Sequence, residues 1–494
     1  MREIVSIIFS LFFAPLYSFS QGIGSNWCFG DSAGISFVNS TVSPLITSME
    51  CRGSSVSLSD SSGSLLFSAN TGYLPYFWAG SNRLGVVWNK NYQLMVNGDS
   101  LVGMAWYHEF LAIPDPGNDS ISILFQIGVT STQGLFYSKI NPYFQNYTGI
   151  VTNKNTQIAI PDNDLADASC AVKHSNGRDW WYFVHNWNGH NDFYVFLITP
   201  FGISGPFIQS VGSNSSTDVM NIVATNSGNK LLVTNNFGLI EVLDFDRCTG
   251  VISNPITIHS EGGLPYFGAA FSPDGQLIYI SNTNNIFGDS LRLFQFDLNA
   301  SNIFGSRISI YTEKVPASGG LLKLGPNGKI YLACLYEYGW PYADSVRNIY
   351  NENISVIENP DILGPGCNFR PFSVYLGGKR CYWGLPNNPN FELGVGQNPN
   401  CDSLTNGIVH LENSPYEFSL SPNPCSDKIT INLSDFPKEA ILMRIFDDTG
   451  REVRRENLFT SSTTLNVSTL PNGIYSVNVQ SGYINRSYRL IKLY

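Results

Sequence analysis

Residues 271–280 of the chain read FSPDGQLIYI, a turn that contains Gly275 followed at once by a short apolar strand. This pattern of a turn glycine and a strand rich in leucine, β-branched or aromatic residues recurs along the chain. The equivalent glycines are Gly63, Gly117, Gly177, Gly228, Gly275, Gly328 and Gly378. Successive glycines lie 47 to 60 residues apart, so the sequence contains an internal repeat long enough for four short strands per unit.

A repeat of this length predicts a β-propeller. A four-stranded sheet cannot bury both of its faces until neighbouring sheets stack around a common axis. Residues 21–397 have room for about seven repeats, so we expect an all-β, about seven-bladed propeller. The ring must be closed, and we expect the early strand at residues 27–37 to pair with the last strands at residues 381–393.

The composition favours many short strands, and the net charge argues against some classes of binding partner. Aromatic residues make up 13% of the 494 residues, and 45 glycines and 26 prolines supply turns. Aspartate and glutamate number 38 against 28 lysines and arginines, a net charge of −10. An acidic chain is a poor partner for nucleic acid or for an anionic membrane surface, so we expect neither.

The first twenty residues read as a secretory signal peptide. Arg2 precedes an apolar run at residues 4–17, and Ser18 and Ser20 are the small residues that a cleavage site before Gln21 requires. A buried first strand is the alternative. No later apolar run reaches the roughly 18 residues that a spanning helix needs, so we expect no transmembrane segment.

Cysteine usage fits an exported protein. All nine cysteines follow residue 20, and eight of them lie before residue 402. An oxidising compartment permits disulfides, and we expect at least two among these eight. Because nine is odd, at least one thiol stays free or pairs elsewhere. There is no CxxC pair, and no histidine stands at zinc-finger spacing, so we expect no structural metal site.

A separate unit follows the repeats. Residues 398–415 are polar and read as a linker. Residues 416–494 carry about seven short strand patterns separated by turn signals at residues 423–424, 448–450 and 471–473. Short strands at this spacing predict a small C-terminal β-sandwich.

Four motifs in this unit resemble a known family. Residues 421–424 (SPNP), 446–451 (FDDTGR), 470–475 (LPNGIY) and 490–494 (LIKLY) are similar to the C-terminal type A sorting domain of type IX secretion substrates in Bacteroidota. The resemblance implies that the type IX secretion machinery is a partner and that the protein is secreted or displayed on the outer cell surface, reached via the periplasm. The motif residues it marks are Pro422, Asn423, Pro424, Gly450, Gly473, Tyr475 and Lys492. A generic immunoglobulin-like sandwich is the alternative.

The repeat region has its own resemblance. Residues 27–30 (WCFG), 271–275 (FSPDG) and 324–331 (LGPNGKIY) are similar to the WD-repeat-like propellers of secreted Bacteroidota proteins. That group shares no agreed reaction. The resemblance therefore implies a fold and a location rather than an activity.

Motifs for catalysis are weak. Residues 30–34 (GDSAG) fit a nucleophile elbow, but no helix pattern follows, and residues 98–101 (GDSL) lack the histidine three residues after an aspartate that such hydrolases need. We therefore expect no catalytic residues and no cofactor. Asp162, Asp164 and Asp167 form the densest acidic loop, for which a solvated loop is the main interpretation and a calcium site the alternative.

Aromatic loops are the best candidates for binding. Trp187 stands in an otherwise polar hairpin loop between His185 and His190, where it could stack on a sugar or anchor a protein, or pack on a neighbouring blade. Trp78 and Trp340 stand in two further aromatic loops. Our leading hypothesis is a non-enzymatic binding module for a glycan or a surface protein. The alternatives are a lactonase-like or glycan-active propeller enzyme with its site at the central channel, and a purely structural envelope protein.

Overall fold

The computed structural model describes residues 22–38, 41–51, 53–72, 85–129, 134–282, 291–314, 316–336, 346–396, 401, 418–433, 441–447, 451–481 and 484–493. The predicted signal peptide lies outside these residues. The chain forms two compact units, Met1–Cys401 and Asp402–Tyr494. Each unit is described by itself.

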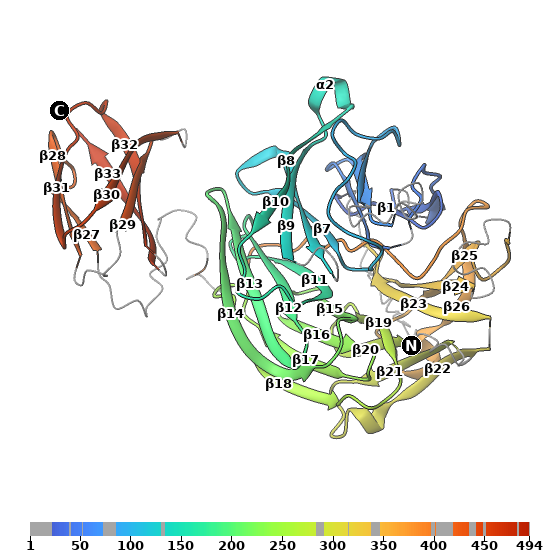
Figure 1. Ribbon diagram of the computed structural model, residues 1–494. Helices are drawn as coiled ribbons and strands as arrows, with labels where there is room; N and C mark the ends of the chain where they lie inside the picture. The colour runs from blue at the N-terminus through green and yellow to red at the C-terminus, as the bar shows by residue number, and fades with distance from the viewer. Residues whose placement is uncertain are drawn as a thin grey trace, which may run out of the picture. The chain divides into compact units, whose positions relative to one another are not determined.

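The N-terminal unit is a seven-bladed β-propeller, as the repeat predicts. Its antiparallel sheets follow one another around a ring in chain order (Figure 1). The first two blades are β1 (Asn26–Phe29), β2 (Ala33–Ser36) and β3 (Ser43–Pro44), then β4 (Ser55–Ser59), β5 (Leu65–Asn70) and β6 (Val86–Asn89). The third and fourth are β7 (Phe110–Asp115), β8 (Asn118–Gly128), β9 (Gly134–Asn141) and β10 (Ile150–Ile158), then β11 (Leu165–Lys173), β12 (Trp180–Asn186), β13 (His190–Thr199) and β14 (Gly202–Ser215).

The remaining three blades also have four strands each. The fifth is β15 (Met220–Ala224), β16 (Lys230–Asn235), β17 (Ile240–Phe245) and β18 (Ile252–His259). The sixth and seventh are β19 (Tyr266–Phe271), β20 (Leu277–Asn282), β21 (Leu291–Asp297) and β22 (Ile308–Glu313), then β23 (Ala317–Leu324), β24 (Ile330–Tyr336), β25 (Asn353–Ile357) and β26 (Phe369–Tyr375). Short helical turns occupy connections: α2 (Phe144–Tyr147), η1 (Phe304–Ser306) and η3 (Gly364–Cys367).

The innermost strands define two faces of the ring. Those of the second to seventh blades are β4, β7, β11, β15, β19 and β23, and each contacts its neighbours around the axis. We call the face at which these strands begin the first face, and the face at which they end the second face. The repeat glycines from Gly63 to Gly328 lie in the turns that follow these strands, on the second face.

The repeat glycines are there for a conformational reason. Gly275 has a φ of 71° and Gly177 a φ of 76°, in the left-handed region that other residues avoid. Gly378 shares this conformation, with a φ of 75°, but it follows β26 and begins no further blade. The first blade is instead formed by the N-terminal strands.

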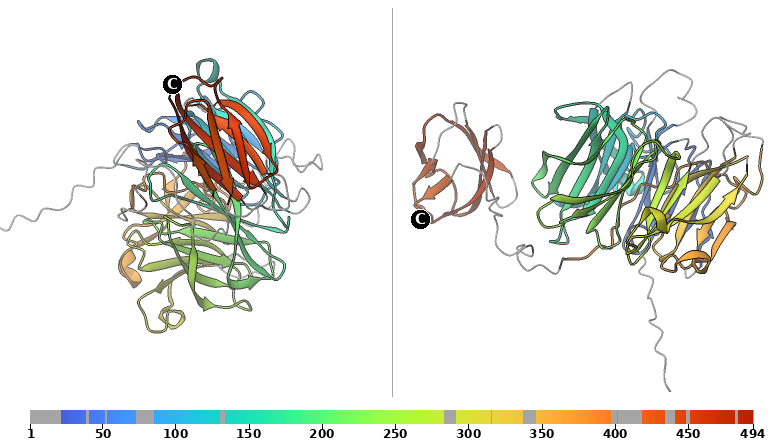
Figure 2. Two further views of the ribbon diagram at one scale, coloured as in Figure 1. Left: turned by 90° about the vertical axis from the view of Figure 1, so that its left-hand side faces the viewer. Right: turned by 90° about the horizontal axis from the view of Figure 1, so that it is seen from below.

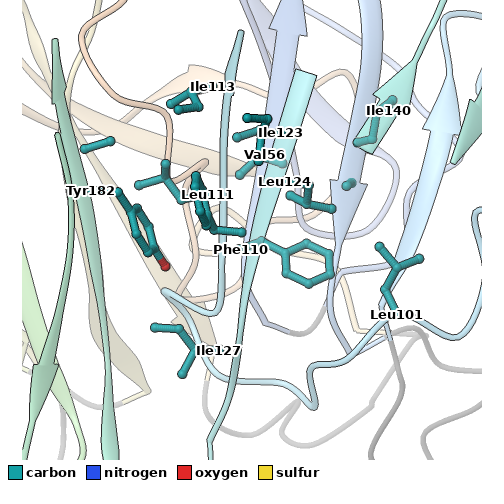
Figure 3. Close-up of a cluster of buried hydrophobic side chains, with 14 of the residues drawn as sticks. Val56, Leu101, Phe110, Leu111, Ile113, Ile123, Leu124, Ile127, Ile140 and Tyr182 are labelled. Atoms are coloured by element: carbon teal, nitrogen blue, oxygen red, sulfur yellow. The ribbon is translucent and has the colours of Figure 1, made fainter. Parts of the chain in front are cut away.

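Adjacent blades hold together by burying apolar side chains between their sheets. Figure 3 shows one such cluster, in which Val56 of β4, Leu111 of β7 and Tyr182 of β12 lie close together. Tyr182 stacks on Phe125 of β8, with ring centroids 4.0 Å apart. Similar clusters fill the other blade interfaces, so the ring has a continuous core around its axis.

Ring closure differs from our expectation. Residues 381–393 do not form a ladder with residues 27–37, because β1 pairs with β2. The contact consists instead of a bridge between Asp31 and Arg380 with a 2.7 Å ion pair between their side chains, and of the Tyr382 hydroxyl, which donates to Asp31 at 2.8 Å. A side chain at Gly30 would overlap the carbonyl oxygen of Arg380, so the close approach needs glycine there. Beyond Arg380 the chain turns into the central channel.

The C-terminal unit is a two-sheet sandwich, as predicted (Figure 2). One sheet holds β27 (Phe418–Ser421), β28 (Lys428–Leu433) and β31 (Ser462–Asn466). The other holds β30 (Glu452–Leu458), β29 (Ile441–Phe446), β32 (Gly473–Ser481) and β33 (Ile484–Lys492). Ile431, Ile445, Tyr475 and Val477 are buried between the sheets, which gives the unit a core of its own.

Candidate functional site

The central channel of the propeller contains a part of the protein's own chain. We call residues 381–396 the channel segment. It runs from the Asp31–Arg380 bridge at one side of the ring through the channel, and Figure 1 shows it as an orange trace crossing the ring. Its hydrogen bonds reach β23, β4, β7, β11 and the turn after β15, which belong to five of the seven blades.

Two asparagines anchor the middle of the channel segment. The Asn388 side chain donates to Ser57 O at 2.9 Å and accepts from Ser57 N–H at 3.1 Å, so the amide takes the place of a neighbouring strand. Asn387 N–H donates to Ser55 O at 2.7 Å, and its side chain donates to Ser169 Oγ at 3.0 Å across the channel. Inner-strand groups that would face an empty channel are thereby satisfied.

Three cationic side chains hold backbone carbonyls at three-residue intervals. Lys323 Nζ donates to Asn388 O, Lys173 Nζ to Phe391 O and Arg247 Nη2 to Gly394 O, each at 2.6 Å. A spacing of three is the repeat of a polyproline II helix, a conformation that Pro386 and Pro389 favour. Burial lowers the pKa of all three cations.

Aromatic side chains cover the first-face end of the channel. Trp383 of the channel segment lies 5.9 Å from the Tyr107 ring and 6.2 Å from the Phe267 ring, between centroids. Its indole N–H donates to Ser318 Oγ at 3.2 Å, and its carbonyl accepts from Leu321 N–H at 2.7 Å. Side chains from two distant blades thus meet the channel segment at this end.

Two acidic side chains, Asp167 and Glu109, lie at this end of the channel, and both accept hydrogen bonds from backbone amides. Asp167 accepts from Tyr107 N–H at 2.8 Å and from His108 N–H at 2.7 Å. Glu109 accepts from the amides of Met104 and Trp106 at 2.8 and 3.1 Å. Burial and the charge of Asp167 raise the pKa of Glu109 well above its usual range. These carboxylates hold the loop before β7 in place.

A cavity of about 890 Å³ remains beside the channel segment and extends to the second face. Its walls are inner-strand residues of several blades together with residues 385–394. Lys323 lies in this wall, and burial lowers its pKa to about 8. Among the described residues, no group of three or more histidine, cysteine, aspartate or glutamate side chains is placed to hold a metal ion.

One disulfide fastens the chain after it leaves the channel. Cys401 is bonded to Cys248, in the turn between β17 and β18, across a sequence separation of 153 residues. We expected at least two disulfides in the ring, and that expectation is wrong. The other seven cysteines are buried, and thiols such as Cys28 and Cys170 pack as small apolar side chains with their pKa raised to about 12 by burial.

The predicted aromatic site is placed as follows. Trp187 lies in the first-face loop between β12 and β13 and packs partly against the core between the fourth and fifth blades. His190 is exposed beside it, 3.7 Å from Asp192. His185 is only 2% exposed and contacts Phe193 edge-on, so it cannot meet a ligand as we expected. Trp78 and Trp340 lie outside the described residues.

The acidic loop does not converge as a calcium site would. Asp162 accepts from Asp164 N–H at 3.0 Å, and Asp164 accepts from Asn188 at 3.3 Å. Asp167 is buried and bonded to the loop before β7 instead. Asp162 and Asp164 therefore bond within their own loop region, whereas Asp167 bonds a different loop.

The motifs of the C-terminal unit meet in space. The Asn423 side chain donates to Arg489 O at 2.6 Å and accepts from Ile491 N–H at 2.9 Å, which ties the first motif to the last. The backbones of Cys425 and Lys492 form an isolated parallel β-bridge next to these bonds. The Tyr475 hydroxyl donates to Pro471 O at 2.6 Å within the third motif. Gly450 lies outside the described residues, and Pro422, Pro424 and Gly473 lie in or beside β27 and β32.

Sequence reasoning missed the channel segment. Residues 385–394 read LPNNPNFELG, which has the proline and asparagine content of a surface linker. The usable signal was the pair of prolines around two asparagines, which suits an extended chain that bonds through side chains. The partner strands are distant in sequence, as with Asn388 and Ser57, and local patterns cannot reveal them.

Comparisons with known proteins bear on the two units differently. Residues 419–492 match the family model described as "Secretion system C-terminal sorting domain". No curated protein sequence matches the chain. Among the described residues, no helix has the length and apolar character to span a membrane.

Several solved propeller structures are similar at low identity. A protein provisionally assigned as a 6-phosphogluconolactonase from Bacteroides uniformis shares 12% identity, with a TM-score of 0.34, over 63% of this chain and 97% of that one. The Cps50 (Swd1) propeller domain of Myceliophteria thermophila shares 12%, with a TM-score of 0.35, over 63% and 94%. PorZ, a surface component of the type IX secretion system of Porphyromonas gingivalis, shares 10%, with a TM-score of 0.30, over 96% and 74%.

Values this low say nothing about activity, so the assignment rests on the sheets of this structure and on the matched C-terminal residues. The four motifs, the family match and the sandwich all agree on the C-terminal unit. The chain is a β-propeller that carries a C-terminal sorting domain of the type IX secretion system, the signal that sends it to the cell surface or out of the cell.

Proposed function

We propose that the protein is a non-enzymatic binding module that works outside the cell and binds a neutral glycan or a surface protein through loops of its first face. The observation that carries this proposal is the channel segment. It occupies part of the axis at which propeller enzymes gather their reacting groups, and Trp383 covers the first-face end.

The ionisable groups near the axis support the same proposal. Asp167 and Glu109 spend their oxygens on backbone amides, as hydrogen bonds of 2.7 to 3.1 Å indicate. A general acid or base has to reach a proton of the substrate. Carboxylates that fix a loop are poorly suited to that work, and we therefore assign binding to the first-face loops.

Trp187 is the side chain we assign to binding. It is part-buried, and its neighbours Asn188, Gly189 and His190 are exposed. A ring held from behind by the blade core can present an edge or a face without a large loss of side-chain entropy on binding. His190 and Asn188 supply hydrogen-bonding groups beside it.

The test is the binding of neutral oligosaccharides on a glycan array and of outer-membrane proteins in a pull-down, with Trp187→Ala compared with the unaltered protein. We expect Trp187→Ala to weaken binding by about 1–3 kcal/mol. Phe201→Ala is the matched control, because Phe201 is an 89% exposed aromatic in the second-face turn of the same blade. Equal binding by the Trp187 variant would place the site elsewhere, and turnover of a lactone or glycoside would favour the enzyme alternative.

A further inference from the structure

The cavity beside the channel segment has the make-up of a ligand site. We infer that it binds a small organic anion with an apolar body, with the ammonium of Lys323 as the anchor for the anionic group. This site is separate from the first-face loops assigned above, and neither proposal depends on the other.

Size and wall are those of a small-molecule pocket. The volume is about 890 Å³, within the range of pockets that enclose drug-sized ligands. Ile222, Ala270, Leu322 and Leu385 contribute apolar wall from three blades and from the channel segment. Such a wall offers burial to a hydrocarbon or aromatic body and no general affinity for a fully polar solute.

Lys323 is a cation in this wall without a counter-ion among the described residues. Its Nζ donates to Asn388 O at 2.6 Å and lies 5.9 Å from the Trp27 ring centroid, and both of these residues also line the cavity. An ammonium has three donors, and one carbonyl satisfies one of them. A cation in an apolar wall is normally paired, so the arrangement is incomplete without an anion.

The other charged groups of the cavity are engaged elsewhere. Glu358 pairs with Lys329 and Arg370, and Asp361 accepts from Asp274 N–H at 3.0 Å. Glu392 is exposed at the mouth. None of these carboxylates forms an ion pair with Lys323 in the part of the chain that is described.

The cavity is open to a ligand from the second face. Asn226, Pro326 and Asp361 line it and are exposed, and they lie in the loops of that face. Lys323 keeps some accessible surface and lines the cavity, and burial lowers its pKa to about 8. A ligand would enter with its anionic group leading and leave its apolar body against the inner strands.

The test uses three ligands of one shape and different charge: octanoate, octanol and octylamine. Each is titrated into the full-length protein at pH 7 by calorimetry, with the thermal unfolding midpoint as a second readout. We expect octanoate to bind at least about tenfold more tightly than octanol, and octylamine to bind least, because only octanoate pairs with the ammonium. Equal affinities for octanoate and octanol, or no binding of either, would overturn the inference.

Variants locate the site. Lys323→Met keeps the length of the side chain and should remove the preference for octanoate, whereas Lys323→Arg should keep it. Lys230→Met is the matched control, since Lys230 pairs with Asp244 and neither of these residues lines the cavity. An octanoate preference that survived in a folded Lys323→Met protein would refute the anchor. Were that variant unfolded, the comparison of the three ligands on the unaltered protein would still decide.

Discussion

Asn388 stands in a sequence that resembles a linker, yet its side chain holds the channel segment to an inner strand. Its side chain mimics a strand edge by donating to and accepting from the backbone of Ser57, 331 residues earlier in the chain. A carbonyl and an amide hydrogen of an inner strand depend on this one amide, because the channel gives them no neighbouring strand.

We expect Asn388→Ala to lower the free energy of unfolding by about 2–3 kcal/mol, the cost of leaving two buried backbone groups without partners. Urea denaturation followed by tryptophan fluorescence measures it. Asn390→Ala is the control, because Asn390 is part-buried and bonds Asn226 O at 2.9 Å at the exposed end of the channel segment. A similar small loss for both variants would mean that water replaces the Asn388 amide without cost.

We expect His185 to make the propeller sensitive to acid. Burial lowers its pKa to about 4, whereas an unfolded histidine titrates near about 6.5. As the pH falls from 6.5 to 4, the unfolded state takes up a proton that the native state refuses, so the free energy of unfolding falls by about 3 kcal/mol from this group. At pH 7 and above the group contributes no pH dependence.

Urea unfolding at pH 7 and pH 4.5 tests this assignment. The loss between the two pH values should be smaller in His185→Leu than in the unaltered protein, whatever the absolute stability of the variant. His190→Leu, at an exposed neighbouring position, is the matched control and is measured at the same two pH values. An unchanged slope in His185→Leu would show that other groups cause the acid sensitivity.

At the scale of elements, the channel segment does the work that a closing strand does in other rings. It has no ladder with β1, yet it bonds to inner strands of several blades and covers the channel with Trp383. Side-chain amides and cations replace the backbone ladder. The Cys248–Cys401 disulfide then fixes the chain on the second face.

We expect Cys401→Ala to lower the free energy of unfolding by up to about 5 kcal/mol, the chain-entropy value for a loop of 153 residues. The double variant Cys248→Ala/Cys401→Ala should lose no more than either single variant, because one bond is lost in each case. Guanidinium unfolding of the three variants measures both quantities. Additive losses would mean that the two cysteines stabilise the protein by packing and not by the bond.

The elements differ in how far the sequence could predict them. Turn glycines such as Gly177 and Gly275 are required by the local backbone, so their spacing revealed the number of blades. The C-terminal motifs were equally local, and the Asn423 bond to β33 explains why the first and last occur together. The route of residues 381–396 depends on contacts hundreds of residues apart, and the burial of His185 depends on how its ring packs against Phe193 in the folded blade. Neither leaves a periodic signal.

At the scale of the whole molecule, the two units have separate cores. Ile431, Ile445 and Val477 are buried among C-terminal residues alone, and the ring ends at Cys401 with its own disulfide. Each unit therefore has what it needs to fold without the other. Sorting and binding are assigned to different units of one chain.

Deletion of residues 419–494 should leave a folded ring that does not reach the cell surface. The purified truncated protein should keep the thermal unfolding midpoint of the ring, and cell fractionation should find it in the periplasm and not at the surface. Deletion of residues 381–494 is the contrasting variant, and it should unfold because the channel segment is lost. Normal surface display of the first truncation would contradict the sorting assignment.

The disulfide also decides how the protein would respond to mechanical force. A pull on the chain beyond Cys401 would reach the Cys248–Cys401 bond first and pass into the hairpin of β17 and β18, whose strands are paired along their length. The channel segment, which lies before Cys401, would carry no tension while that bond is intact. With the bond reduced, the same pull would draw residues 381–396 out of the ring through its second face. The hydrogen bonds from the three cations to the carbonyls of Gly394, Phe391 and Asn388 would break one after another.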